Sequence, residues 1–335
     1  MIESHLRFRP FSREIPTFVP IPGTTYGAKI FPARVEIFSL GNGNVLLEKE
    51  FSFGPLDQFL VTLNLERMTV EVSGFVGKEC VRYEIRRDHI HAVKGFSEDI
   101  SFAKDESPFN SGERERLSLG CAKAQDITLM MRRGSLEELV PFWYFLSQSF
   151  PLCEDGAEKG DSLFHELESA VTARDKTVLA ERLLSVLRTA FTSLFLPHVG
   201  DDFHLGFKLP LFALEKTPSP LLLFRKSFPL LRSLFFQEHA HSCEILPLLP
   251  PQFHAGRMTH MKTARGHALS IEWTKKAPRR IFFEAASDDS FAIKFPHDIK
   301  RFRLRLFDRT VGTVLNGSEV SLEAGKRYLL DRFER

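Results

Sequence analysis

Cysteine, tryptophan and tyrosine are scarce in this chain, and their scarcity narrows what the protein can be. The 335 residues include 4 Cys, 2 Trp and 4 Tyr. No two cysteines form a CxxC pair, so zinc-ribbon and thioredoxin-like sites are excluded. The cysteines are scattered along the chain, at Cys80, Cys121, Cys153 and Cys243. We expect free thiols in a reducing compartment, with disulfides as the alternative.

Long apolar runs and a surplus of one charge are also missing. No charge-free stretch reaches the roughly 18 residues that a membrane span requires, and the N-terminus, MIESHLRFRPFSREIP, has no apolar leader core. The net charge is +2, from 45 Lys and Arg against 43 Asp and Glu. A nucleic-acid-binding protein usually has a stronger basic surplus. We therefore expect a cytoplasmic protein with no membrane span and no nucleic-acid partner.

The short motifs that mark common cofactor sites and nucleophiles are missing as well. There is no GxxxxGK[ST] phosphate loop, no GxGxxG after a strand, no HExxH and no GxSxG. We expect no cofactor. Phenylalanine, in contrast, is abundant, with 33 residues, which points to core packing because its ring carries no polar group. Sugar-binding platforms usually use Trp or Tyr, so this composition weighs against a broad carbohydrate-binding surface.

The pattern along the chain predicts a multidomain α+β protein. Residues 1–96 form an N-terminal antiparallel β sandwich with an extended arm, because alternating apolar runs are separated by turn residues. The GNGN turn at 41–44 separates two such runs, which is a strong β-hairpin signal. Polar residues 97–116 form a linker, residues 117–256 a helical domain, and residues 257–335, where alternation returns, a C-terminal antiparallel β sandwich.

Caps and prolines predict the helix boundaries. Ser135 and Glu138 match a capping box, so a helix should run from about Leu136 to Ser149. Pro141 falls in its second turn and predicts a kink or a restart. Three more helices are expected: from Asp161 to Thr172, from Asp175 or Lys176 to Pro197, and from Ser219 to Glu238 with an interruption at Pro229.

Titratable side chains gather most densely between residues 238 and 254, at Glu238, His239, His241, Glu244 and His254. The two histidines of the HxH spacing could bind a metal if a third ligand came close. The alternative is the polar end of a helix, where histidine interacts favourably with the helix dipole. We expect no metal.

Three aspartates are candidates for catalysis. Asp201 and Asp202 follow a helix, and paired carboxylates can cleave a glycosidic bond if one of them is held protonated. An exposed turn is the alternative. Asp126 precedes a helical run, where it could serve a pocket; the alternatives are a helix cap or a structural salt bridge. Trp143 could stack on a sugar, although its helical spacing favours core packing.

Residues 233–273 resemble a signature of the α-L-fucosidase-type glycoside hydrolases, family 95. Members of this family carry a pattern close to LLQSHxGEIxLLPALPxxWxxG. In this chain, FFQEH stands at 235–239 and ILPLLP at 245–250, and Phe253 and Gly256 take the W and G positions. Arg265 is similar to the Arg of the family's ARGG run, and 269–273 resembles its strand that ends in Trp.

This resemblance implies a β sandwich, a helical region and a second β sandwich, with a carbohydrate as the ligand. The ligand-binding candidates are His239, His241, Trp143 and Arg265. The family places a catalytic carboxylate upstream of the Gln. Here the corresponding run, PLLLFRKSFPLLRS, contains no carboxylate, and Leu222 stands near that position.

Glycoside hydrolysis needs two positioned carboxylates. We therefore expect a non-catalytic or diverged relative that acts as a carbohydrate-binding or assembly module, with a carbohydrate or a partner protein as its ligand. The alternative is an active carbohydrate hydrolase with relocated carboxylates in the helical region. Its candidates would be Asp126, Asp201, Asp202 and Glu238, and whether the protein is an enzyme stays open at this point.

Overall fold

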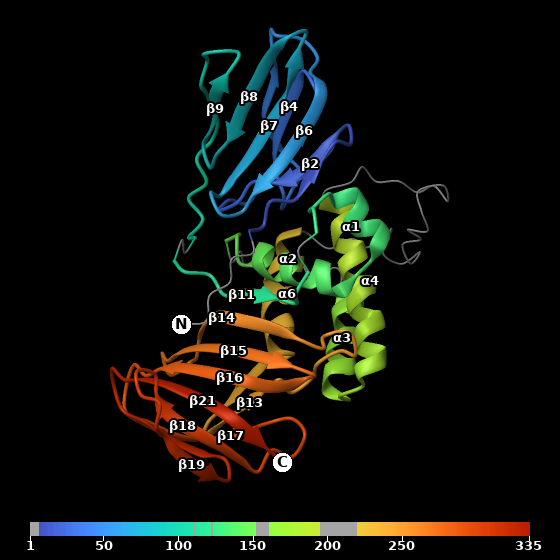
Figure 1. The fold of residues 1–335 in the computed structure, drawn as a ribbon. Coiled ribbons are helices and arrows are strands. Elements are labelled where there is room, and N and C mark those ends of the chain that lie inside the picture. Colours follow the sequence, from blue (N-terminus) through green and yellow to red (C-terminus); the bar gives the residue numbers. More distant parts are fainter. Residues whose placement is uncertain (1–6, 110–111, 122, 152–160, 195–219) are drawn as a thin grey trace.

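The computed structural model describes residues 7–109, 112–121, 123–151, 161–194 and 220–335. Three parts follow one another along the molecule: two N-terminal sheets, a central group of helices and two C-terminal sheets (Figure 1). This order confirms the predicted multidomain α+β architecture.

The N-terminal part consists of two antiparallel sheets. Their strand orders are β1-β6-β7-β8-β9-β10 and β2-β3-β4-β5. The strands are β1 (Phe11–Ser12), β2 (Thr17–Pro20), β3 (Tyr26–Ile30), β4 (Arg34–Ser39), β5 (Val45–Glu50), β6 (Asp57–Asn64), β7 (Thr69–Val76), β8 (Glu79–Ile85), β9 (His89–Lys94) and β10 (Ile100–Ser101). The turn at 41–44 joins β4 to β5 as predicted. Ile37, Val70 and Ile85 are fully buried, because alternate residues of a strand point to the same face.

Five described helices form the centre of the molecule: α1 (Ile127–Arg133), α2 (Leu136–Ser147), α3 (Asp161–Thr172), α4 (Lys176–Leu194) and α6 (Pro220–Ser233). α2 packs against α4, α6 and the strand β11. It runs through Pro141, and α6 runs through Pro229, so the predicted restart and interruption are wrong. A proline removes one backbone donor from a helix, and the almost complete burial of α2 offsets this loss.

The observed helix starts agree with the predicted starts, but one of the predicted capping interactions does not form. Ser135 is the N-cap residue of α2, but its side chain makes no capping hydrogen bond. The predicted capping box is therefore wrong, and Glu138 instead accepts a hydrogen bond from Arg133 Nε over 2.8 Å. Before α4, Asp175 Oδ1 accepts hydrogen bonds from the backbone N–H groups of Thr177 and Val178. This cap confirms the predicted start of that helix.

The C-terminal part consists of a seven-stranded sheet, in the order β11-β14-β15-β16-β21-β18-β19, and a four-stranded sheet, β12-β13-β17-β20. The strands pair antiparallel except β13 and β17, which are parallel. The bounds are β11 (Arg116–Ser118), β12 (Phe236–His239), β13 (Ser242–Ile245), β14 (Gly256–Lys262), β15 (Ala268–Thr274), β16 (Ala277–Glu284), β17 (Asp289–Lys294), β18 (Arg301–Leu306), β19 (Thr313–Asn316), β20 (Glu319–Leu322) and β21 (Arg327–Glu334).

The predicted helix from Ser219 to Glu238 is too long. α6 ends at Ser233, and the chain turns into the hairpin β12–β13, in which Glu238 pairs with Cys243. Phe235 and Phe236 are buried at this change of direction, and aromatic residues favour extended backbone. His239 therefore ends a strand, and the predicted interaction of its side chain with a helix dipole is wrong.

Two further features bear on the sequence-based expectations. Within the described residues, no helix is long and apolar enough to cross a membrane. Cys80, Cys121 and Cys243 are free thiols, and Cys153 lies outside the described residues.

Candidate functional site

The catalytic candidates of the helical region do not form a site in the part of the chain that the structure describes. Asp126 is the N-cap residue of α1, and its Oδ1 accepts a 3.0 Å hydrogen bond from Leu129 N. This geometry matches the capping alternative. Trp143 is fully buried, and its ring centroid lies 5.4 Å from that of Phe224. Asp201 and Asp202 lie outside the described residues.

The fold brings Glu238 and Arg265 together, close to the backbone of His239. Arg265 lies 3.8 Å from the Glu238 carboxylate, and it donates to the backbone carbonyls of His239 and Ala240. Glu238 also accepts a 2.7 Å hydrogen bond from Ala264 N. His239 and His241 are both exposed. The arginine therefore fastens the β12–β13 hairpin to the loop after β14.

As far as the described residues show, this region has no room for a sugar and holds no activated nucleophile. Its cavity measures about 10 Å³, which is the space of a single water. Both ring nitrogens of His267 are engaged, one with Asp289 at 2.9 Å and the other as acceptor from Ala286 N. Burial, followed by the nearby Glu238 charge, raises the pKa of Cys243 to about 12. The thiol therefore stays protonated near neutral pH.

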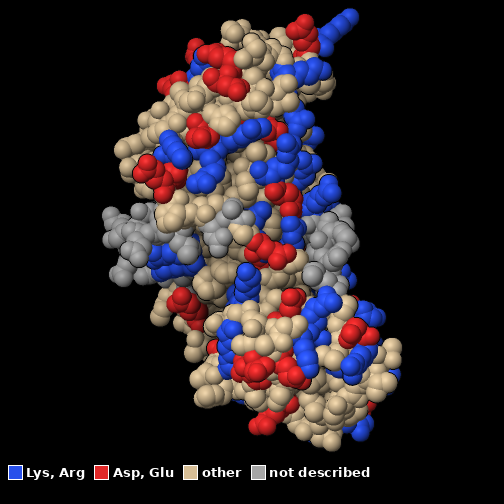
Figure 2. Space-filling view, turned by 90° about the vertical axis from the view of Figure 1, so that its left-hand side faces the viewer, with Lys and Arg blue, Asp and Glu red and all other residues tan. Residues whose placement is uncertain are grey.

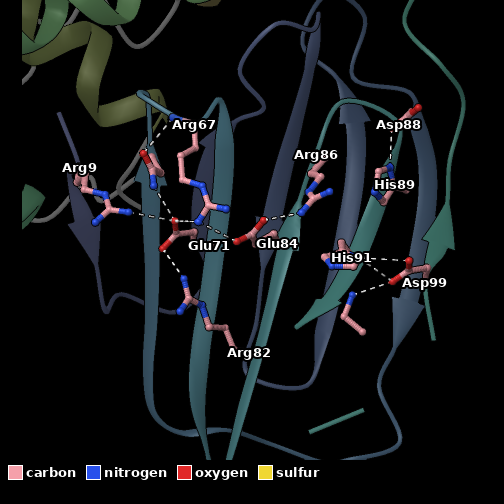
Figure 3. A network of polar contacts seen from close by, with 12 residues as sticks. Arg9, Arg67, Glu71, Arg82, Glu84, Arg86, Asp88, His89, His91 and Asp99 are labelled. Atoms are coloured by element: carbon pink, nitrogen blue, oxygen red, sulfur yellow. Dashed lines mark hydrogen bonds and ion pairs between the residues drawn. The ribbon is translucent and has the colours of Figure 1, made fainter. Parts of the chain in front are cut away.

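A different cluster lies on the outward face of the N-terminal sheet, where the structure places a row of charged side chains (Figure 3). Glu71 on β7 is directly opposite Glu84 on β8, and Glu84 is opposite His91 on β9. Two like charges opposite each other destabilise a sheet unless cations separate them. The sequence supplies those cations on the same strands and the adjoining turns.

Four arginines surround the two glutamates. Arg67 Nη1 lies 3.5 Å from Glu84 and 3.9 Å from Glu71, so one guanidinium bridges both carboxylates. Arg86 pairs with Glu84 at 3.0 Å. Arg82 and Arg9 pair with Glu71 at 3.1 and 3.4 Å. The arginine side chains are 40–56% exposed, whereas that of Glu84 is 4% exposed. Nearly buried carboxylates thus hold a set of guanidinium groups at the surface.

One end of this face is hollowed into a cleft of about 450 Å³, which we call the polar cleft. Arg67, Arg86, Arg87 and Lys104 bring positive charge to it, and Glu84, Asp88 and Asp105 negative charge; Met68, Thr69 and His89 complete the lining. The Oγ1 atom of Thr69 is buried and has no hydrogen-bond partner among the described residues. A buried hydroxyl of this kind is costly unless a ligand or a water completes it.

Three aspartates at and beside the cleft have a lowered pKa, which favours their charged form. The hydrogen bond with His89 lowers the pKa of Asp88 and outweighs the opposing effect of burial. Burial alone would raise the pKa of Asp105, but hydrogen bonds from Thr25 and Ser107 lower it. Asp99, next to His91, has a lowered pKa because Ala92 N and His91 hydrogen-bond to it.

The surface view agrees with this charge distribution. Lys and Arg side chains gather on the part of the N-terminal sandwich that lies nearest the helices, with acidic side chains among them (Figure 2). The formal net charge of +2 for the whole chain conceals this local gathering.

Chemically, this arrangement favours binding of an anion over acid–base catalysis. A general acid needs a carboxyl group that keeps its proton in an apolar setting, whereas Glu71 and Glu84 are both ion-paired with arginine. Half-exposed guanidinium groups held in place by carboxylates are well suited to carboxylate, sulfate or phosphate groups.

Sequence reasoning missed this face, although a signal was present. Charged residues recur at every second position in Arg82, Glu84, Arg86 and Asp88, which places them on one face of a strand and its continuation. Such alternation is common on solvated sheets, and only the pairing of β7 with β8 shows that two glutamates meet there.

The candidate site therefore rests on the geometry of this chain, because no protein-family model and no curated protein matches it.

Proposed function

We propose that the protein is a non-catalytic binding module that recognises an anionic saccharide at the polar cleft. One observation carries this proposal. Arg67, Arg86, Arg87 and Lys104 line the same cleft as Thr69, and the buried Thr69 hydroxyl has no partner among the described residues. An anionic oxygen on the ligand would accept from the hydroxyl and pair with the cations.

The position of the aromatic side chains supports an anionic ligand over a neutral one. Trp143, Trp273, Tyr83, Tyr144 and Tyr328 are all buried. Neutral sugars are usually held by stacking on exposed Trp or Tyr rings, and only Tyr26 of these residue types is partly exposed. The sequence resemblance at 233–273 is the reason for choosing a saccharide among the possible anionic ligands.

The contacts of the candidate carboxylates are the reason for proposing a non-catalytic protein. Asp126 caps α1, and Glu238 is tied to Ala264 N and Arg265. Among the described residues, the small cavity that Glu238 lines contains no second carboxylate, although hydrolysis of a glycosidic bond would need one. The alternative, an active hydrolase, would depend on Asp201 or Asp202, which lie outside the described residues.

The test is isothermal titration of the full chain with three probes: a sulfated hexasaccharide, a neutral hexasaccharide of the same length, and inorganic sulfate. We expect saturable binding of the sulfated probe, much weaker binding of sulfate and none of the neutral sugar. Arg86→Gln should weaken binding about tenfold, the effect of losing one charge-assisted contact. Raising the salt concentration should also weaken binding.

Arg301→Gln is the matched control. Arg301 also forms a surface ion pair, with Glu334, but on the C-terminal sheet, and its loss should leave binding unchanged. Equal effects of the two variants, or no binding of the sulfated probe, would refute the proposal. Release of reducing ends from either hexasaccharide would favour the hydrolase alternative, and Asp201→Asn and Asp202→Asn would then identify its carboxylate.

A further inference from the structure

A second cavity, about 880 Å³ in volume, lies where residues 108–109 and 112–114 meet the end of α2 and the middle of α6. We call it the aromatic cavity, because Phe109, Phe150, Phe224 and Phe228 line it. Its volume falls within the range of about 300–1,000 Å³ that is typical of small-molecule sites.

Two of the four phenylalanines are buried, and the other two are partly exposed. Phe150 and Phe224 are buried and stack with a centroid distance of 4.4 Å. Phe228 is partly exposed and packs on Tyr144 at 5.3 Å, and Phe109 is also partly exposed. An aromatic ring entering from solvent would therefore contact rings that are already held in place, so little ordering cost would accompany binding.

Arg114 is among the residues that line this apolar cavity, and its guanidinium is held by neighbouring groups. It donates to Ser149 Oγ at 2.7 Å, to Leu65 O at 2.8 Å and to Met68 Sδ at 3.3 Å. Its guanidinium lies 4.2 Å from the centroid of the Phe145 ring. Among the described residues, no carboxylate lies within 4.0 Å of it. Burial, only partly offset by the charge of Glu66, lowers the pKa of Arg114 to about 10, so the group is still a cation at neutral pH.

Among the described residues of the lining, Glu113 is the one carboxylate, and it contacts another partner. Its Oε1 lies 2.7 Å from His260 Nδ1. Gln148, also in the lining, donates to the backbone carbonyls of Glu115 and Tyr144 and accepts from Glu115 N. The described part of the lining therefore combines apolar rings with the cation of Arg114, and no carboxylate in it contacts Arg114.

We propose that the aromatic cavity binds a small amphipathic anion, with an aromatic body against the phenylalanines and a carboxylate or sulfonate group at Arg114. Arg114 has five N–H donors as a residue type, and the three contacts above leave donors for such a group. A partly desolvated cation without a carboxylate partner gains most from an anionic ligand.

This site is separate from the polar cleft but adjoins it. Met68 lines the polar cleft and contacts Arg114, which lines the aromatic cavity. Arg87 of the cleft lies 5.9 Å from the ring centroid of Phe109. Each site uses its own cations, so binding at the aromatic cavity does not depend on the proposed saccharide function.

The experiment compares two fluorescent probes of nearly the same shape, 8-anilinonaphthalene-1-sulfonate, which is anionic, and N-phenyl-1-naphthylamine, which is neutral. We expect saturable binding of the sulfonate at one site of the full chain. Arg114→Gln should weaken sulfonate binding about tenfold, the loss of one charge-assisted hydrogen bond, and change binding of the neutral probe less than twofold. Phe228→Ala should weaken binding of both probes, because it removes apolar contact area.

Two control variants test whether the sulfonate binds elsewhere on the chain. Phe307→Ala removes an exposed ring on the C-terminal part, and Arg86→Gln removes a cation of the polar cleft. Neither should change binding of the sulfonate. If Arg114→Gln fails to fold, Phe109→Ala, at a partly exposed position, takes the place of that variant and should weaken both probes. The proposal is wrong if Arg114→Gln weakens both probes equally, or if Phe228→Ala and Phe109→Ala leave the sulfonate affinity unchanged.

Discussion

Glu71 and Glu84 lie directly opposite each other on neighbouring strands, and the single guanidinium of Arg67 is within ion-pair distance of both. Like charges in this position repel each other. Folding of this sheet therefore depends on cations that the same face supplies. Arg67, which lines the polar cleft, therefore also stabilises the pairing of β7 with β8.

Arg67→Met should lower the free energy of unfolding by about 1 kcal/mol, because the two carboxylates lose the cation they share. The loss is modest because the Arg67 side chain is 56% exposed. In the double variant with Glu84→Gln, part of the loss should be recovered. Urea denaturation of the four chains in this double-mutant cycle measures the coupling. Arg301→Met serves as the control, because both side chains of the Arg301–Glu334 ion pair are exposed. It should lower the free energy of unfolding less than Arg67→Met does.

The periodicity of apolar residues in the sequence predicted most of the fold. Alternation predicted the sheets on both sides of the helical region, and the turn at 41–44 joins two strands as expected. The errors lie where tertiary contacts override a local signal. Pro141 sits inside a helix because the surrounding side chains are buried. The chain after Ser233 becomes a strand because β13 pairs with it.

The candidate site was harder to predict than the fold. Dense titratable residues at 238–254 drew attention, but most of the polar groups there hold a hairpin to the neighbouring loop. The polar cleft instead combines residues from the β6–β7 and β8–β9 turns with Lys104 and Asp105. Its defining feature is the buried Thr69 hydroxyl in a cleft that four cationic side chains also line. This arrangement depends on the three-dimensional fold, so the spacing of residues in the sequence does not predict it.

Glu115→Gln should be far more damaging than the loss of a surface charge. The buried Glu115 carboxylate accepts hydrogen bonds from Tyr144 Oη, from Arg232 Nε at 3.0 Å and from Lys262 N at 3.4 Å. These contacts join α2, α6 and β14. Burial and the Glu115 charge raise the pKa of Tyr144 well above 10, so its hydroxyl remains a donor. Neutralising the carboxylate leaves the Arg232 cation without its partner, at a cost of about 3 kcal/mol.

Thermal and urea unfolding of Glu115→Gln measure this cost, with Glu106→Gln as the control because Glu106 is exposed. The glutamine variant should also unfold with a lower apparent cooperativity, since the helices and the C-terminal sheet share this carboxylate. A loss no larger than that of the control would mean that the contacts of Glu115 add little to the docking of these elements.

Gly256→Ala should destabilise the C-terminal sheet by about 1–3 kcal/mol, the usual cost of overpacking. A Cβ at this position would lie 2.3 Å from Trp273 Cζ2 and 2.8 Å from the Ser118 carbonyl oxygen. Trp273 cannot easily move, because it is 1% exposed and its Nε1 donates to Phe253 O at 3.2 Å. Phe253 and Gly256 hold the W and G positions of the sequence resemblance, and here they pack with Trp273.

Urea denaturation in two backgrounds tests whether the indole causes this loss. Trp273→Phe removes the ring atom that the new Cβ would meet, so Gly256→Ala should cost clearly less in that background than in the natural chain. The remaining cost reflects the Ser118 carbonyl, which the second substitution leaves in place. The same cost in both backgrounds would assign the requirement for glycine to the backbone of β11 alone. If the buried Trp273 is what requires glycine at position 256, these residues of the 233–273 segment are needed to pack the C-terminal core. Core packing then explains their spacing without any catalytic role.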